Sequence, residues 1–169
     1  MDVMRNPGEA PAAAAVLRHA DEGSRLEILG ARYVFKATSA ETAGSFCCIE
    51  VSVPPGRGVP PHTHTHEDEA FHVLAGKIVI DCAGLEGPQC LGPGGFFFGP
   101  RGLRHAFRNE GAEEARLLVF CLPGAGIEAM FRQMDAAGRG GEPSIATILA
   151  IAASAGVDIA SEPEPAATV

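Results

Sequence analysis

The sequence has no tryptophan, a single tyrosine and few basic residues. It holds 13 Lys and Arg against 21 Asp and Glu, a formal net charge of -8. Binding to a nucleic-acid backbone depends on clustered Lys and Arg, so we expect no nucleic-acid partner.

Long apolar runs are missing too. The longest candidate, residues 145–156, contains Thr147 and Ser154 and is shorter than the roughly 18–20 residues of a membrane-spanning helix, so we expect no membrane protein.

The sequence has no C-x-x-C pair, and we expect no secretion signal. The alanine run at residues 12–15 follows Asp2 and Glu9 and has no basic segment before it, unlike a signal peptide. We therefore expect a cytoplasmic protein with a loose N-terminal arm. The 5 cysteines, an odd number without a C-x-x-C pair, predict reduced and mostly buried thiols rather than a disulfide framework or thiol catalysis. They are Cys47, Cys48, Cys82, Cys90 and Cys121.

Glycine and proline divide the middle of the chain into short pieces. With 21 Gly and 13 Pro in 169 residues, turn signals recur at close intervals, and no helical period lies between them. This texture predicts one all-β domain, a barrel or sandwich, with a jelly-roll barrel favoured. The pieces rich in Val, Ile and Phe predict strands at residues 32–37, 45–53, 69–74, 77–82, 95–98, 105–109 and 115–122.

The pattern changes after Pro123. Ile127, Met130 and Met134 recur at helical spacing and predict a helix from Gly126 with Gly138 as its C-cap. A second helix is expected from Ser144 as N-cap to Gly156 as the stop. The predicted organisation is a flexible arm at residues 1–25, a barrel at 26–124, and a C-terminal helical extension and tail at 125–169.

Histidines crowd into one segment, PPHTHTHEDEAFHVLAG. His62 and His64 are separated by one residue, so on an extended strand both rings point to the same face. Glu69 opens the next strand and can face the same point across a hairpin, while His105 begins a later strand after a GPRG turn. Three imidazoles and one carboxylate form a ligand set suited to Fe, Mn, Ni, Co, Cu or Zn. The sequence therefore predicts a site for one divalent transition metal ion.

Two longer motifs contain these residues and resemble the cupin family. The first is Gly, five residues, His-x-His, a short spacer, Glu, six residues and Gly; the second is Gly, five residues, Pro-x-Gly, two residues, His, three residues and Asn. Gly95 departs from the second pattern, where many cupins have Asp. The resemblance implies a double-stranded β-helix (jelly-roll) cupin barrel with C-terminal helices, and metal ligation by His62, His64, Glu69 and His105. The matching positions are Gly56, His62, His64, Glu69 and Gly76, then Gly94, Pro100, Gly102, His105 and Asn109.

The chain is also similar to small bacterial single-domain cupins that resemble quercetin 2,3-dioxygenase. The segments DEAFHVLAGKIVI, PRGLRHAFRNEG and ARLLVFCLPGAGIEAMFRQM carry this similarity. It implies a metal-dependent dioxygenase that uses O2 on a flavonol-like or other enolisable aromatic molecule, with Glu69 as general base. Two alternatives stay open: a non-redox cyclase, isomerase or decarboxylase of small-molecule biosynthesis, and a small-ligand-binding cupin. The family also suggests a homodimer formed through an exposed sheet or the C-terminal helices.

The residues around the expected ligands receive different interpretations. Phe71 and Phe107 each lie two residues beyond a ligand and should share its face, so with Val73 they form the predicted substrate pocket, or else plain barrel core. Glu67 and Asp68 are expected in a solvated turn. Two further histidines are expected away from the metal, His66 on the surface and His72 on the opposite strand face. Alternation cannot resolve which way the adjacent side chains of GGFFFGP point.

Overall fold

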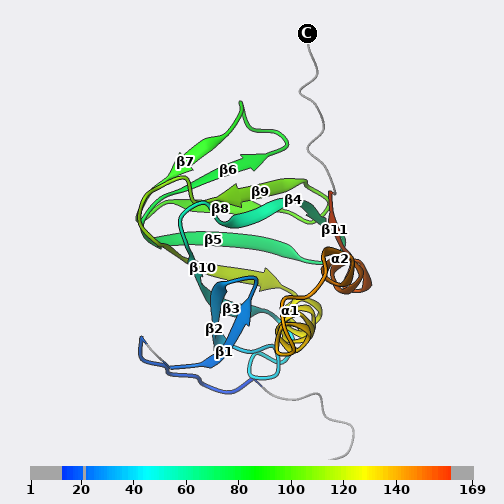
Figure 1. Cartoon of the computed structure of the whole chain (residues 1–169). Helices are drawn as coiled ribbons and strands as arrows, with labels where there is room; N and C mark the ends of the chain where they lie inside the picture. Colours follow the sequence, from blue (N-terminus) through cyan, green and yellow to red (C-terminus); the bar gives the residue numbers. More distant parts are fainter. Residues whose placement is uncertain (1–12, 21, 161–169) are drawn as a thin grey trace, which may run out of the picture.

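Two antiparallel sheets form the body of the protein, as the computed structural model shows for residues 13–20 and 22–160 (Figure 1). The six-stranded sheet has the order β1-β2-β3-β10-β5-β8, and the five-stranded sheet has the order β11-β4-β9-β6-β7. The predicted all-β jelly-roll barrel with C-terminal helices is confirmed. The elements are β1 (Ser24–Ile28), β2 (Ala31–Ala37), β3 (Cys47–Val53), β4 (Gly58–His64), β5 (Asp68–Ala75), β6 (Ile78–Cys82), β7 (Gln89–Leu91), β8 (Phe96–Gly99), β9 (His105–Arg108), β10 (Ala115–Leu122), α1 (Ala125–Gly138), α2 (Ile145–Ser154) and β11 (Val157–Ile159).

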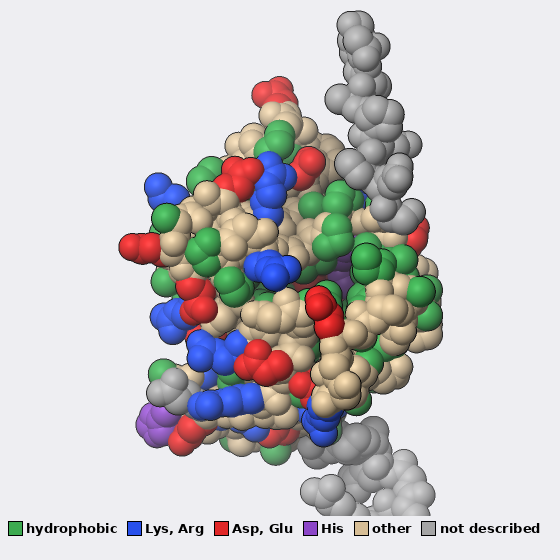
Figure 2. Space-filling view, viewed as in Figure 1, with side chains coloured by type: hydrophobic (Ala, Val, Ile, Leu, Met, Phe, Trp, Pro, Cys, Tyr) green, Lys and Arg blue, Asp and Glu red, His purple; other side chains and the backbone are tan. Residues whose placement is uncertain are grey.

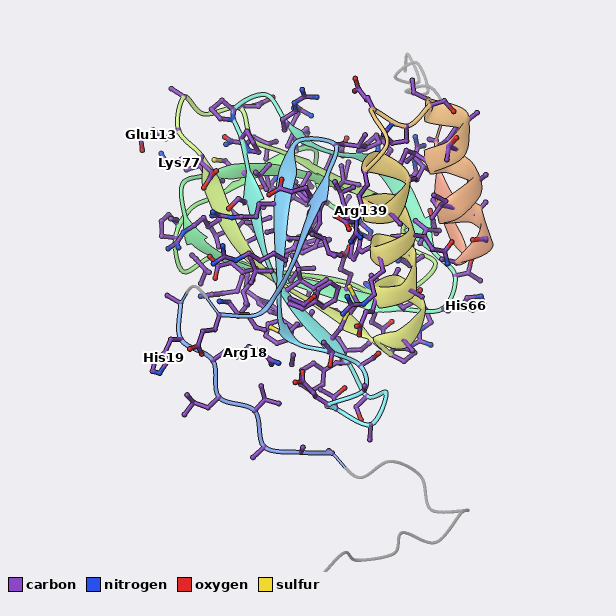
Figure 3. The ribbon with its side chains drawn as sticks, turned by 60° about the horizontal axis from the view of Figure 1, so that its bottom comes forward. Arg18, His19, His66, Lys77, Glu113 and Arg139 are labelled. Carbon is purple, nitrogen blue, oxygen red and sulfur yellow. The ribbon has the colours of Figure 1, made fainter. Side chains whose placement is uncertain are left out.

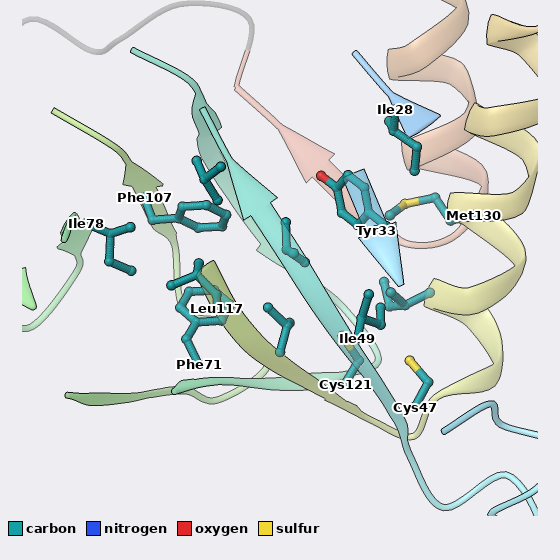
Figure 4. Close-up of a cluster of buried hydrophobic side chains, with 14 of the residues drawn as sticks. Ile28, Tyr33, Cys47, Ile49, Phe71, Ile78, Phe107, Leu117, Cys121 and Met130 are labelled. Atoms are coloured by element: carbon teal, nitrogen blue, oxygen red, sulfur yellow. The ribbon is translucent and has the colours of Figure 1, made fainter. Parts of the chain in front are cut away.

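Alternating side chains build the core between the sheets. In β10 every second residue from Ala115 to Cys121 is buried, and the residues between them face outward. Leu117 lies opposite Val51 of β3 and Val73 of β5, so three neighbouring strands contribute to the same layer. Leu117, Phe71 and Phe107 belong to the same cluster of buried hydrophobic side chains (Figure 4). Four of the five cysteines are buried and Cys90 is exposed, all as free thiols.

The two helices lie together at one side of the barrel (Figure 1). Helix α1 packs on the β1–β2 hairpin, where the Phe131 and Tyr33 rings lie 5.0 Å apart and Asp135 accepts a hydrogen bond from the Glu27 amide. Ser144 caps α2 through its Oγ, which accepts from the Thr147 amide at 3.1 Å. Both expected helices are present. Gly138 is the last residue of α1 rather than its cap, which is Arg139.

The predicted N-terminal arm, residues 1–25, falls partly outside the described residues. Within them, Arg18 makes a bidentate ion pair with Glu41 at 2.6 and 3.2 Å and donates to the Lys36 carbonyl at 2.6 Å. β1 begins at Ser24. The domain boundaries proposed from the sequence stay a prediction.

The surface carries charges of both signs. Figure 2 shows Lys and Arg interspersed with Asp and Glu on one face, with no continuous basic area there. Across the described part of the chain, no helix has the length and apolar character needed to cross a membrane.

Candidate metal centre

The four predicted ligands come from three strands in both sheets. His62 and His64 lie near the end of β4, His105 begins β9 beside them, and Glu69 lies on β5 in the opposite sheet. His62 is the register partner of His105. Gly102, with φ of +79°, forms the turn before β9, and its amide donates to the His64 carbonyl at 2.8 Å. This turn fixes the start of β9 against the end of β4, and therefore fixes His105 against the other two histidines.

The ligand atoms converge on one buried point. One nitrogen from each imidazole and one Glu69 oxygen all lie within 4.8 Å of one another. Glu69 Oε2 lies 2.9 Å from Nε2 of His105, 3.4 Å from Nε2 of His64 and 3.7 Å from Nε2 of His62. All four residues are at most 6% exposed. This His-His-Glu-His group can bind a metal ion, as the sequence predicted.

Backbone carbonyls orient two of the three rings. His62 Nδ1 donates to the Pro60 carbonyl at 2.9 Å, and His105 Nδ1 donates to the Leu103 carbonyl at 3.0 Å. A hydrogen on Nδ1 leaves Nε2 as the ligand atom and turns it toward Glu69. His64 differs, because neither of its ring nitrogens has a hydrogen-bond partner. Such a buried, unpartnered nitrogen in a group of converging donors fits a cation ligand.

The electrostatics of the site favour an ionised Glu69. Burial raises the pKa of this carboxyl group, but the facing imidazoles of His105, His62 and His64 outweigh burial and hold the pKa well below its usual range. Burial lowers the pKa of His105, yet the hydrogen bond with Glu69 and its charge bring the pKa above its ordinary value. The ionised Glu69 carboxylate and the His105 imidazole therefore stabilise each other electrostatically.

The predicted pocket residues pack beside the ligands in the core. Phe71, Val73 and Phe107 are 0%, 1% and 6% exposed. The Phe71 ring lies 6.2 Å from the His105 ring and 5.1 Å from the Phe107 ring. Within GGFFFGP, the side chain of Phe97 points inward, with its ring 5.6 Å from the His105 ring. The side chains of the two neighbouring Phe residues point outward. Phe97 is a site neighbour that the sequence could not identify.

One expectation for the neighbouring residues is wrong. Glu67 does not lie in a solvated turn, because it is only 2% exposed and its Oε2 lies 3.8 Å from His64 Nδ1. The cause is tertiary, since the first turn of α1 covers this carboxylate at Gly126. The adjacent Asp68 is half-buried and pairs with Arg101 at 3.0 Å. His66 is exposed at the edge of the molecule (Figure 3), and His72 lies on the outer face of β5, half-buried.

Two further features of the site have no sequence signal. Cys121 is fully buried, and its thiol donates to the second oxygen of Glu69, Oε1, at 3.8 Å. The short strand β11 pairs with β4 at the metal segment, with Ile159 opposite His62 and Val157 opposite His64. β11 is therefore the edge strand of the five-stranded sheet, next to the strand that carries both histidines.

Comparison with known proteins matches the part of the chain that contains this site. The family model for the cupin domain matches residues 49–121, a range that contains all four residues of the candidate site. Among solved structures, KdgF from Halomonas sp. superposes with a TM-score of 0.57 at 18% identity, covering 65% of this chain and 96% of that chain. A cupin-superfamily sugar phosphate isomerase from Silicibacter pomeroyi has a TM-score of 0.54 at 22% identity, covering 62% and 73%. Identities this low show the shared fold alone.

Curated proteins match part of the chain, among them two from Streptomyces species. Protein SchB of Streptomyces halstedii is 33% identical over 92 residues, which are 54% of this chain and 64% of that protein. Polyketide synthase CurC of Streptomyces cyaneus is 33% identical over 69 residues, which are 41% of this chain and 44% of that protein. In both cases the matched segment spans less than two thirds of the relative. The match of residues 49–121 to the cupin-domain model, together with the jelly-roll fold, supports the cupin superfamily.

Proposed function

We propose that this protein is an enzyme that binds one divalent transition metal ion through His62, His64, Glu69 and His105 and acts on a small molecule. The observation that carries the proposal is the convergence of these four buried ligand atoms within 4.8 Å, with one imidazole still unpartnered. A bound cation supplies Lewis-acid stabilisation of negative charge that develops on a substrate oxygen. Fe, Mn, Ni, Co, Cu and Zn all suit the ligand set.

In this proposal Glu69 is the general base. The facing imidazoles keep its carboxylate ionised, and an ionised carboxylate can accept a proton from an enolisable substrate. The apolar rings of Phe71, Phe97 and Phe107 pack next to the site, and with Val73 they exclude water and suit a planar aromatic molecule. Glu69→Gln keeps three imidazoles, so it should cost turnover more than metal affinity.

The first candidate reaction is dioxygenation of a flavonol-like or other enolisable aromatic molecule, following the resemblance to quercetin 2,3-dioxygenase. The second is a non-redox reaction of small-molecule biosynthesis, such as cyclisation, isomerisation or decarboxylation. The likeness to a relative named as a polyketide synthase supports this second candidate. Both use the same site and the same base.

Oxygen uptake separates the two candidates. Protein reconstituted with each metal is mixed with a panel of flavonols and other enolisable aromatics, and dissolved O2 and products are followed together. Consumption of O2 in step with substrate loss supports dioxygenation, and substrate loss at equal rate under argon supports the non-redox reaction. Glu69→Gln should lose either activity. Activity that survives chelation in the wild type would contradict the proposed metal dependence.

A homodimer is also proposed, through the outer face of the six-stranded sheet. Phe96 and Phe98 of β8 are 61% and 53% exposed there, and Leu74 and Leu122 of the next two strands are 36% and 38% exposed. Exposed large apolar groups on one face favour a protein partner. Light scattering should give twice the monomer mass for the wild type and monomer mass for Phe98→Glu; a monomeric wild type would contradict the dimer. A cytoplasmic location stays a prediction.

A further inference from the structure

Unsatisfied polar atoms gather at one place in this protein. Among the described residues, three buried side-chain atoms have no hydrogen-bond partner: Nδ1 and Nε2 of His64, and Oε2 of Glu67. Burial of polar groups without partners is costly and calls for an explanation. Nε2 of His64 belongs to the ligand group already described. Nδ1 of His64 and the Glu67 carboxylate do not belong to that group. His64 Nδ1 and Glu67 Oε2 lie 3.8 Å apart.

His64 lacks the support that the other two histidines have. Nδ1 of His62 and of His105 each donates to the carbonyl two residues earlier, at 2.9 and 3.0 Å. The acceptor that faces Nδ1 of His64 is instead the Glu67 side chain. A hydrogen bond requires about 2.7–3.2 Å, so the present 3.8 Å needs to shorten by less than about 1 Å.

The surroundings of Glu67 hold its carboxylate at this position. A Cβ atom on Gly126 would lie 2.6 Å from Glu67 Oε1, so the missing side chain at Gly126 makes room for it. Gly126 is the second residue of α1, and the N-terminus of a helix favours a nearby negative charge. The carboxylate is therefore enclosed between β4 and the start of α1.

We propose that Glu67 is a positioning residue of the metal site, which accepts a hydrogen bond from His64 Nδ1 when Nε2 of His64 ligates the cation. This inference rests on the proposed function, since it requires a metal at the four ligands. Histidine ligands commonly donate their second N–H to a carboxylate or carbonyl, which fixes the tautomer and raises the basicity of the ligand atom. Glu67 also adds a negative charge that compensates the cation.

Metal affinity tests this assignment. Chelator-treated protein is titrated with Co²⁺ and followed by visible absorption, with Zn²⁺ competition for tight binders. Loss of such a carboxylate weakens metal binding by about 10- to 100-fold, so we expect about 10-fold for Glu67→Gln, whose amide oxygen still accepts, and up to about 100-fold for Glu67→Ala. Asp68→Asn removes the same charge one residue away without contacting His64, and it should retain the wild-type dissociation constant.

A second pair of variants leaves every polar group intact. Gly126→Ala forces the Glu67 carboxylate to shift and should weaken Co²⁺ binding. Gly138→Ala, in the same helix with nothing within 4 Å of the new Cβ, should not. In Zn²⁺-loaded wild type, proton NMR should show a slowly exchanging His64 Nδ1–H resonance that is absent from Glu67→Ala.

The stability of the metal-free protein separates positioning from a merely structural role. Because Glu67 Oε2 is buried without a partner, Glu67→Gln should unfold at a urea midpoint equal to or above that of the wild type while binding Co²⁺ more weakly. Wild-type Co²⁺ affinity in Glu67→Ala, or a midpoint that falls together with affinity in Glu67→Gln, would overturn the inference. A wild type that binds no metal would instead overturn the proposed function.

Discussion

We predict that the side chain of Asn109 stabilises the barrel strongly. Its side chain is fully buried just after β9 and joins three segments of the chain. Nδ2 donates to the Val53 carbonyl at 2.8 Å and to the Glu113 carbonyl at 2.7 Å, while Oδ1 accepts from the Gly111 amide at 2.9 Å. The end of β3, the end of β9 and the turn before β10 are therefore held by one amide group.

The size of the effect follows from those three bonds. Asn109→Ala leaves the Val53 carbonyl buried without a partner, at a cost of about 1–3 kcal/mol, while the Glu113 and Gly111 groups are more exposed and lose about 0.5–1 kcal/mol each. The expected loss is about 2–5 kcal/mol, a large part of the 5–15 kcal/mol free energy of unfolding that is typical of a native protein. Asn109→Asp has nearly the same shape but cannot donate while ionised, and it faces two carbonyl oxygens. Asn109→Asp should therefore destabilise the protein more than Asn109→Ala does at pH 7.

Urea unfolding followed by circular dichroism at pH 7 checks the predicted order of stability, in which wild type is the most stable and Asn109→Asp the least. In Asn109→Asp, the folded environment raises the pKa of the introduced carboxyl group above its unfolded value. The penalty of this variant relative to wild type should therefore shrink as pH falls, when the protonated form can donate. If Asn109→Asp is within about 0.5 kcal/mol of wild type at pH 7, the reasoning about this amide is refuted.

Two other substitutions are predicted. The hydrogen bond from Arg18 lowers the pKa of Glu41 from 4.5 to about 2. The contribution of this ion pair to folding stability is therefore present above the unfolded pKa of Glu41 and is lost as pH falls toward 2. Glu41→Gln should cost about 1 kcal/mol at pH 7, after allowance for solvent screening, and it should reduce the loss of stability between pH 4.5 and 2 in acid titrations; an unchanged acid profile would contradict this. Phe97→Ala should cost about 3 kcal/mol and lower metal affinity by loosening His105, whereas unchanged affinity would show that Phe97 does not support the ligand.

Local patterns explain how much of this structure can be predicted from the sequence. The spacing of His62 and His64 puts both rings on one strand face, and two multi-position motifs place Glu69 and His105 beside them. Helical spacing and the Ser144 cap predict α1 and α2. These features depend on residues close together in the chain, or on a pattern with many fixed positions.

Other parts depend on contacts between distant segments. β11 is short and pairs with β4, which lies far earlier in the chain, and β7 is short and largely exposed, so neither has a periodic signal. Glu67 looks like part of an acidic surface run, but it is buried beside Gly126 at the start of α1, which lies far away in the sequence. The direction of Phe97 is hidden between two other Phe residues and is set by the pairing of β8 with β5.

Metal content per chain tests the central claim most directly. Untagged wild type, His62→Ala, His105→Ala and the control His66→Ala are measured by mass spectrometry after reconstitution, so that binding by the exposed histidine next to the site is accounted for. We predict about one metal ion per chain in wild type and His66→Ala, and loss of metal from His62→Ala and His105→Ala. A wild type without bound metal, or full occupancy in both ligand variants, would contradict the account.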